Sequence, residues 1–548
     1  MGTNAAKILP LLAVGILLTS GLPMSAQDSP KPVVRRAEAV AVSPPLHELA
    51  KLPAPPHYGF HEGTLVRRVP RPPSGPVVDT VEQNTRGASS NFSLGLDLLG
   101  LGNGFLNFSV SSAPPNPSLG VGDTQVVQWV DSSYAVFDKS TGHLLAGPIA
   151  GNTIWSSLGG PCASSNDDIE LIVQWDKAHH RWLLFQDVFT GPPYYTCVAV
   201  STSSDALGSY FLYQFPQGTS LQDSPKWGVW SNGYYQTQLE YSGEGFVGPE
   251  LCAYNSAKLL TGDGSAEQIC FVLSPGDGAP LPADIDSSLA PPSNQDEFFM
   301  SLWDPTHLSL YSLHPDYQNP SNSTVTGNNG SQLISVPAFT PACNGAYDGA
   351  CVPQKGIPDQ LDVLGDRLLY RLAYWEDPPL MNVLATPPKP IPSQHWYALH
   401  DSTASGGNEA PRWYEFTAPI KAVPVTGISL FQSGTFAPDS NCRWMGSIAR
   451  DKKYDILMGY SESSSNLYPS IGITGRTLGD PLGTMESELL LISGTGSQPD
   501  TSNHWGNYSS MRIDQDGCTF WYTSEYYMVT QPRDWSTQIG SVKFVGCQ

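Results

Sequence analysis

A recurring two-strand unit is the feature of this 548-residue sequence that most limits its possible folds. Each unit has a polar or glycine-containing corner, a short strand, a turn, and a second strand rich in aromatic residues. Because one such unit buries only part of its apolar surface, several must pack together. The pattern predicts an all-β protein, a β-propeller of six or seven blades, with a large β-sandwich or a β-helix as the alternative. Seven units can be placed, anchored at Gly122, Asp168, Asp223, Asp296, Asp359, Arg443 and Trp505.

Composition supports this interpretation. The chain has 52 Gly and 49 Pro, aromatic residues make up 10% of it and charged residues only 14%. Turn formers and strand formers therefore outweigh helix formers, which argues against a helical bundle, a coiled coil or a charged disordered protein. The formal net charge of −22 makes nucleic acid a poor partner.

The N-terminal region is expected to direct export. Lys7 precedes an apolar run and then small residues up to Ala26, the pattern of a secretory signal peptide over residues 1–26. No later stretch approaches about 18 uninterrupted apolar residues, so we expect a secreted or periplasmic protein without a transmembrane segment. Residues 27–86 form a proline-rich basic arm or linker, and residues 87–548 the propeller domain. The arm either tethers the protein to an envelope polymer, lies on its own acidic domain, or is disordered.

The nine cysteines suit an exported protein. None is in a CxxC pair, so a zinc site is not expected. Neighbouring cysteines would close short loops as disulfides, although the sequence does not fix their connectivity. Cys442 would be left over, either as an ordinary buried thiol or as a reactive one beside Arg443. The neighbouring pairs are Cys162 with Cys197, Cys252 with Cys270, Cys343 with Cys351, and Cys518 with Cys547.

Polar side chains recur at the starts of the predicted first strands, which line the central channel of a propeller. They would converge on one mouth of that channel. Carboxylates, cations and indoles gathered there would suit a sugar. The structural alternative is that the aspartates cap turns and the indoles pack between blades. The residues are Asp168, Glu170, Asp223, Lys226, Asp359, Asp362, Arg443, Trp444, Trp505 and Asn507.

Several motifs carry a resemblance to a known family. They include Asp223-Ser-Pro-Lys, Arg443-Trp-Met-Gly-Ser-Ile-Ala and His504-Trp-Gly-Asn-Tyr-Ser-Ser-Met. With these, residues 110–548 resemble a family of uncharacterised exported bacterial β-propeller proteins that are sialidase-like in architecture. The family usually reads Arg-Trp-Gly-Asp-Tyr near its end, where this chain has His504 and Asn507.

A sialidase comparison implies an arginine triad and a Tyr/Glu pair. Glu525-Tyr526 supplies such a pair, and the arginines beyond residue 86 include Arg371, Arg412, Arg443 and Arg476. The Asp-box of sialidases is matched only in its second half, by Gly517-Cys-Thr-Phe, and the early Arg-Ile-Pro signature is absent. The resemblance therefore implies the architecture rather than sialidase activity.

Two functions remain open at this point. The first is a glycoside hydrolase with paired carboxylates at the channel mouth, which requires two of them within about 5–10 Å across a cleft. The second is a non-enzymatic glycan- or protein-binding or adhesion module. We expect a monomer without a catalytic metal, with Asp514-Gln-Asp516-Gly517 as a candidate for a structural calcium. The catalytic candidates are Asp168, Asp223, Asp362 and Glu525, and the substrate-binding candidates are Lys226, Arg371, Arg443, Trp444, Trp505 and Tyr526.

Overall fold

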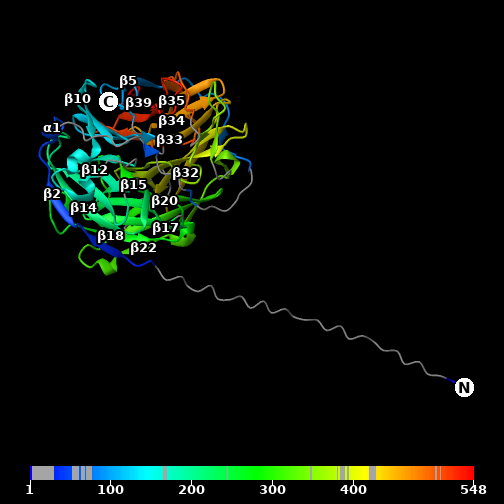
Figure 1. Cartoon of the computed structure of the whole chain (residues 1–548). Coiled ribbons are helices and arrows are strands. Elements are labelled where there is room, and N and C mark those ends of the chain that lie inside the picture. The colour runs from blue at the N-terminus through cyan, green and yellow to red at the C-terminus, as the bar shows by residue number, and fades with distance from the viewer. Residues whose placement is uncertain are drawn as a thin grey trace.

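The structure is a computed structural model, and almost all of its regular elements are strands (Figure 1). The expected signal peptide, apart from residues 1–2, and its cleavage site lie outside the described residues, as do Asp168 and Asn507. Within the described part of the chain, no helix is long and apolar enough to cross a membrane. The structure describes residues 1–2, 30–51, 61–62, 68–69, 77–110, 112–164, 170–189, 191–243, 245–345, 349–378, 380–382, 389–391, 394–418, 427–499, 503–506 and 508–548.

Five antiparallel sheets of four or five strands form much of the molecule. The first contains β7 (Ser118–Val121), β8 (Gln125–Val130), β9 (Ser133–Asp138) and β10 (Leu144–Ala150). The second contains β11 (Ile172–Asp176), β12 (Arg181–Val188), β13 (Tyr194–Ser201), β14 (Tyr210–Gly218) and β2 (Ala39–Val42). The third contains β15 (Leu221–Trp230), β16 (Gly233–Ser242), β17 (Gly245–Tyr254), β18 (Glu267–Val272) and β1 (Val33–Arg36). The other two contain β33 (Cys442–Arg450), β34 (Ile456–Ser464), β35 (Leu467–Arg476) and β36 (Leu489–Ile492), and β37 (Ser510–Ile513), β38 (Thr519–Tyr526), β39 (Ser536–Phe544) and β5 (Phe92–Leu99).

A larger, eleven-stranded sheet consists of two groups joined by the parallel pair β19–β27, and within the groups all pairings are antiparallel except that of β4 with β32. One group contains β19 (Leu281–Ile285), β20 (Glu297–Asp304), β21 (His307–His314), β22 (Thr324–Thr326) and β23 (Leu333–Ser335). The other contains β27 (Leu372–Glu376), β30 (Gln394–Thr403), β31 (Glu409–Ala418), β32 (Ser429–Phe436), β4 (Glu82–Gln83) and β24 (Thr340–Pro341). The repeat unit predicted at Asp296 corresponds to β20 and β21. This group in fact begins one strand earlier, with the proline-containing β19.

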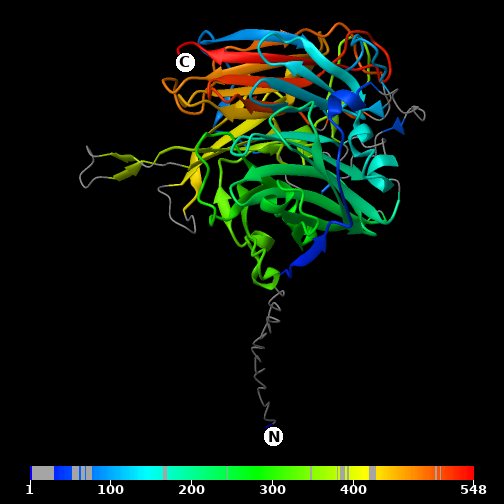
Figure 2. The ribbon, with the colours of Figure 1, turned by 90° about the vertical axis from the view of Figure 1, so that its left-hand side faces the viewer.

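The remaining elements are short. The hairpin formed by β28 (Leu380–Asn382) and β29 (Lys389–Ile391) stands away from the body in Figure 2. The other two-stranded sheets pair β3 (His61–Glu62) with β6 (Ser112–Ala113), and β25 (Ala350–Val352) with β26 (Leu361–Asp362). The α-helices are α1 (Leu46–Leu49), α2 (Gly160–Ser164) and α3 (Ser256–Leu259), and the 3₁₀ turns are η1 (Gly151–Trp155), η2 (Pro275–Asp277), η3 (Pro320–Asn322), η4 (Asn328–Gly330) and η5 (Ala342–Gly345).

Neighbouring sheets contact one another through their first strands. In chain order these are β7, β11, β15, β19, β27, β33 and β37, and β37 in turn contacts β7. Most of these strands are buried along their whole length, so both faces are covered and polar side chains within them need internal partners. Nine tryptophans are among the largest fully buried side chains, which places the aromatic content of the sequence in the core.

Segments of the N-terminal region complete several sheets. β1 pairs with β18, β2 with β14, β4 with β32, and β5 with β39, so the described parts of residues 30–99 lie on the body. Figure 2 shows β5, in blue, beside the red strand β39. An early strand thereby closes the last sheet of the chain.

Disulfides connect the four neighbouring cysteine pairs favoured by the sequence. They join Cys162 to Cys197, Cys252 to Cys270, Cys343 to Cys351, and Cys518 to Cys547. Such bonds are typical of proteins that fold in an oxidising compartment.

Candidate functional site

The first predicted site residues lie where β15 begins. A bulge between Asp223 and Lys226 interrupts the pairing of β15 with β16, and Ser224 takes up a positive φ of 55° within it. Bulges of this kind redirect side chains near functional sites. The Lys226 ammonium lies 3.7 Å from the centroid of the Tyr508 ring and 3.3 Å from the Ser224 hydroxyl oxygen.

Two carboxyl groups and two basic groups share this region, which we call the inner cluster: Glu170, Asp223, Lys226 and Arg367. Burial raises the pKa of Glu170 to about 8, and the neighbouring Asp223 adds to the rise. Burial also lowers the pKa of Lys226 to about 7. Both groups therefore exchange protons near neutral pH, as acid–base catalysis requires. The cavity beside Lys226 measures only about 10 Å³, however, which is room for about one water molecule.

A buried ion-pair network occupies the adjoining first strands. Arg371 is 1% exposed and pairs with both Asp284 and Asp286, while Arg512 also pairs with Asp284. Burial disfavours the charged form of Asp284, but Arg512 and Arg371 overcome this effect and hold its pKa below the ordinary value. Arg371 is therefore enclosed between carboxylates of its own chain rather than directed at solvent.

The other predicted site residues have different neighbours. Asp362 pairs with Arg68, and Glu525 accepts a hydrogen bond of 2.8 Å from the Gly506 amide. Burial raises the pKa of both carboxyl groups. Asp223, Asp362 and Glu525 thus stand in three distinct environments. Asp359 is half-buried, and Tyr526 is 4% exposed.

The two predicted indoles pack against each other. Trp444 and Trp505 are 0% and 1% exposed, with ring centroids 5.4 Å apart, and Trp505 donates a hydrogen bond to Ser461. Neither ring face is available to a sugar in this conformation. The two indoles therefore serve packing rather than sugar binding, which was the alternative left open by the sequence.

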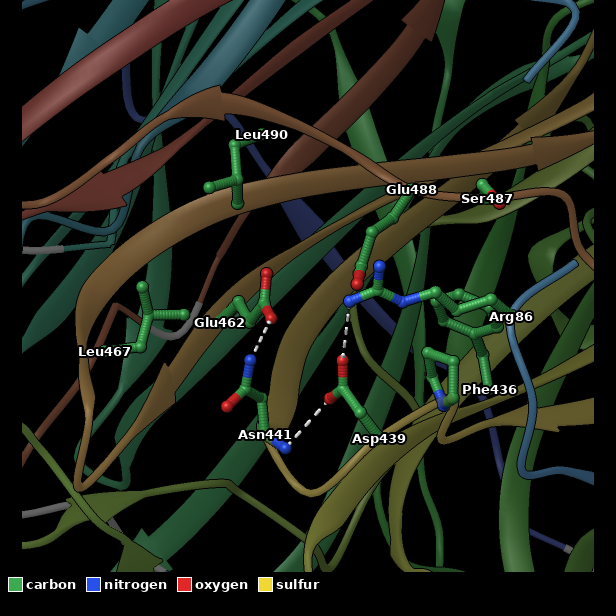
Figure 3. A pocket seen from close by; sticks show the side chains of 10 residues that line it. Arg86, Phe436, Asp439, Asn441, Glu462, Leu467, Ser487, Glu488 and Leu490 are labelled. Carbon is green, nitrogen blue, oxygen red and sulfur yellow. Dashed lines mark hydrogen bonds and ion pairs between the residues drawn. The ribbon is translucent and has the colours of Figure 1, made fainter. Parts of the chain in front are cut away.

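A pocket open to solvent lies between the end of β32 and the sheet that begins with β33 (Figure 3). Its volume is about 300 Å³, at the lower end of the range for small-ligand sites. In Figure 3, Asn441 bridges two of its carboxylates: the backbone amide donates to Asp439 at 3.0 Å and the side-chain amide to Glu462 at 2.7 Å. The pocket is lined by Arg86, Phe436, Pro438, Asp439, Asn441, Glu462, Leu467, Ser487, Glu488 and Leu490.

Arg443, a predicted substrate-binding residue, holds the three carboxylates of this pocket together. It is fully buried, and its Nη1 lies 3.0 Å from Asp439. Its Nη2 lies 2.6 Å from Glu488 Oε1 and 3.1 Å from Glu462 Oε1. Because both oxygens contact the same nitrogen, the carboxyl groups of Glu462 and Glu488 are close neighbours.

The electrostatics of the pocket favour a proton on Glu462. Burial raises the pKa of Glu462 to about 7, and the nearby Glu488 adds to the rise while Arg443 opposes it. The exposed fractions of the Asp439, Glu488 and Glu462 side chains are 30%, 16% and 5%, so the group with the raised pKa is the deepest of the three. A deep protonated carboxyl beside a more exposed carboxylate is an arrangement used in acid–base catalysis.

Sequence reasoning found Arg443 but missed Asp439, Glu462 and Glu488. Arg443 and Glu462 come from paired positions of β33 and β34, and Glu488 immediately precedes β36. Arg443 is separated from Glu462 by 19 residues and Glu462 from Glu488 by 26, and such spacings carry no local motif. The available signal was Glu462, the one charged residue in the strand Ile456–Ser464.

The four arginines of the sialidase comparison are not gathered at one site. Arg371 pairs with Asp284, Arg412 with Asp79, and Arg443 with the pocket carboxylates. Arg476 donates to the backbone oxygen of Asp480. A three-arginine grip on one substrate carboxylate is therefore not formed by these residues.

Candidate metal ligands are engaged in other interactions. Asp514 pairs with Lys139 at 2.8 Å, and Asp516 accepts hydrogen bonds from the Cys518 and Thr519 amides, as in an ordinary turn. Two groups with metal-like spacing, Glu250 with Cys252 and Cys270, and Glu409 with Cys343 and Cys351, contain disulfide-bonded sulfurs.

Cys442 is a free, buried cysteine, as expected for the residue left over from pairing. Burial raises the pKa of its thiol to about 11, so it lacks the thiolate character of a reactive nucleophile at neutral pH.

Comparisons with known proteins give no family for this chain. No protein-family model and no curated protein matches it. Similar solved structures include the N-terminal domain of Nup159, with TM-score 0.33 and 9% identity over 88% of this chain and 99% of that one. Prolyl oligopeptidase B from Galerina marginata has TM-score 0.31 and 11% identity, over 75% of this chain and 54% of that one. An alpha-L-arabinofuranosidase from Lactobacillus brevis has TM-score 0.25 and 11% identity, over 59% and 90%.

Proposed function

We propose that this protein is an exported, carbohydrate-active β-propeller with sialidase-like architecture, and that it hydrolyses glycosidic bonds in the pocket around Arg443. The propeller arrangement is supported by the order of contacts among the first strands, which runs from β7 to β37 and returns to β7. The disulfides support export, because they form and persist outside the reducing cytosol.

One observation carries the proposed activity. Glu462 and Glu488 both accept from Nη2 of Arg443, at 3.1 and 2.6 Å, in a pocket that solvent can enter. A glycoside hydrolase needs two carboxyl groups at this kind of spacing on either side of the bond that breaks. We assign these two roles to Glu462 and Glu488, although neither was among the predicted catalytic residues.

The environments of the two groups suggest their roles. Glu462, whose pKa burial raises to about 7, would protonate the leaving-group oxygen. Glu488 is fixed by Nε and Nη2 of Arg443 and by the Tyr460 hydroxyl, and would attack the anomeric carbon. The short spacing of the pair then predicts retention of anomeric configuration.

The test is a polysaccharide-hydrolysis panel run beside a glycan array on the chain from Gln27 onwards. Glu462→Gln and Glu488→Gln should each reduce product release at least about 100-fold, because each variant removes one of two essential carboxyl groups. Both changes nearly preserve side-chain volume, so far-UV circular dichroism should be unchanged. Product release by both variants at the rate of the unsubstituted protein would overturn the assignment.

A second candidate function, glycan recognition without hydrolysis, is favoured by the hydrogen bonding of the carboxylates. Arg443 and Asn441 already fix Glu462, and Arg443 and Tyr460 already fix Glu488. Groups held in this way suit the binding of sugar hydroxyls as well as proton transfer. Saturable binding on the array without any product, weakened by Glu488→Gln, would identify this function instead.

A further inference from the structure

We propose that the pocket around Arg443 takes sugars that carry a protonated amine, and that Asp439 is the residue that selects them. The inference rests on the proposed carbohydrate function and names its substrate class, which is hexosamine units rather than neutral or carboxylated sugars. Asp439 has no part in the hydrolytic pair assigned above, so its role is that of a specificity residue.

Arg443 has no donor left for an acidic sugar. A guanidinium carries five N–H groups. The Nε group donates to Glu488 at 2.8 Å, and Nη1 donates to Asp439 at 3.0 Å and to the Asn441 carbonyl oxygen at 3.1 Å. Nη2 donates to Glu462 at 3.1 Å and to Glu488 at 2.6 Å. The buried cation of the pocket is therefore fully occupied by groups of its own chain.

Asp439 keeps one oxygen available to a ligand. Its Oδ1 accepts hydrogen bonds from the Arg443 guanidinium and from the Asn441 amide. Its Oδ2 faces Arg86, whose Nη2 lies 3.8 Å away, beyond hydrogen-bonding distance (Figure 3). Because the Asp439 side chain is 30% exposed, a ligand that enters the pocket can reach this oxygen.

The charges of the pocket favour a cation beside Asp439. Burial disfavours the charged form of Asp439, but the hydrogen bond and the charge of Arg443 outweigh burial and hold its pKa below the ordinary value. Asp439 and Glu488 are both paired with the single buried cation Arg443. Arg86 adds a second positive charge, but its side chain is 76% exposed, so water screens it and a ligand can displace it. The net charge of −22 also attracts a cationic polymer to the molecule as a whole.

An ammonium group and a carboxylate would meet opposite conditions here. An ammonium brings three donors, so it can pair with Asp439 Oδ2 at the position that Arg86 now faces. A sugar carboxylate brings only acceptors, and it would lie beside Asp439 and Glu488 without a free donor from Arg443. Like charges left unpaired in this way reject a ligand. The sugar ring has an apolar contact in Leu490, which lines the pocket and is 39% exposed.

The test measures the binding of monosaccharides, which contain no glycosidic bond and therefore report recognition without hydrolysis. The chain from Gln27 onwards is titrated with glucosamine, N-acetylglucosamine and glucuronic acid at pH 6, where an aliphatic amine is protonated. Ligand-observed NMR gives the three affinities. Glucosamine should bind at least about tenfold more tightly than the other two, because it alone forms a charged hydrogen bond with Asp439.

Asp439→Asn nearly preserves the side-chain volume and removes the charge. It should bring the affinities for glucosamine and N-acetylglucosamine to within about twofold of each other, mainly by weakening glucosamine binding. The matched control is Asp263→Asn, which removes the same charge from an exposed turn where Asp263 accepts from the Ser265 amide. This control should keep the full preference for glucosamine.

Three results would overturn the inference: no saturable binding of glucosamine, glucuronic acid binding as tightly as glucosamine, or a preference for glucosamine that folded Asp439→Asn retains. The first two need only the unsubstituted protein, so they hold even if Asp439→Asn fails to fold. Hydrolysis is judged separately, on the polysaccharide panel. Product release combined with one of these three results would remove the amine specificity and leave the proposed activity in place. A preference for glucosamine without any product release would do the reverse.

Discussion

Arg371 and Arg443 show the same chemistry in two settings. Each is a fully buried guanidinium held by carboxylates of its own chain. The partners of Arg371, Asp284 and Asp286, have side chains only 3% and 4% exposed. Among the partners of Arg443, Asp439 reaches 30% and Glu488 16%, and all border an open pocket.

The difference distinguishes ion pairs that only stabilise the fold from charged groups that can contact a ligand. At Arg371 the cations hold the pKa of Asp284 below its ordinary value, whereas burial raises the pKa of Asp286, and both side chains are enclosed. At Arg443 three acids share one buried cation, and the pKa of Glu462 rises. A protonated carboxyl that borders an open pocket can pass its proton to a ligand, whereas a carboxyl enclosed in the core cannot.

The largest expected effect comes from breaking the enclosed network. Arg371→Met should lower the free energy of unfolding by about 3–5 kcal/mol, because it leaves buried carboxylates without a cation. Arg443→Met should cost less, because two of its carboxylate partners reach water. Urea denaturation of the two variants measures both values. A larger loss for Arg443→Met would reverse the distinction between the two sites.

The next effect is a pH dependence that belongs to the pocket. The folded-state pKa of Glu462, about 7, lies above its unfolded value near 4.3, so the folded protein binds the extra proton between these limits. Stability from this group is therefore present at the acidic end of that window and is lost as the pH rises through 7.

In the unsubstituted protein, titration of Glu462 lowers the free energy of unfolding as the pH rises from 5 to 8. Glu462→Gln should make this decrease smaller by an amount on the order of 1–3 kcal/mol. Denaturation midpoints across that range provide the measurement, and Glu170, whose pKa is also raised, contributes equally to both proteins. If the denaturation midpoints of the two proteins changed with pH in the same way, the pKa of Glu462 would not be raised by folding.

The smallest expected effect concerns Arg86 at the rim of the pocket. Its side chain is 76% exposed and lies 3.8 Å from Asp439, so Arg86→Ala should change the free energy of unfolding by less than about 0.5 kcal/mol. Loss of glycan binding without loss of stability would place Arg86 in ligand contact. A marked drop in melting temperature would instead make it part of the fold.

Much of the fold could be predicted because its signals are local. Turn residues and aromatic strands mark most sheets, and short loops favour the observed disulfide pairs, such as Cys162 with Cys197. The first strand of the β19 group was missed because Leu281–Ile285 contains a proline and pairs in parallel with β27, a strand nearly 90 residues later. Nothing in the local pattern reveals a partner so distant.

The candidate site was only partly predictable, for the same reason. Arg443 was found because it starts a repeated motif. Glu462 meets it once β33 pairs with β34, whereas Glu488 meets it only after β35 and β36 have joined the same sheet. Trp444 and Trp505 lie at the expected repeat positions, but they turn inward and pack against each other. A strand position in the sequence does not reveal which neighbouring sheet covers a side chain.

The most direct test of the central claim compares product release by Glu488→Gln and Asp223→Asn on the same polysaccharide substrate. Asp223 belongs to the enclosed inner cluster, where the cavity is about 10 Å³, and Glu488 borders the open pocket. We predict that Glu488→Gln abolishes product release while Asp223→Asn retains it. Activity lost in Asp223→Asn and kept in Glu488→Gln, with both proteins folded, would contradict the assignment of the site.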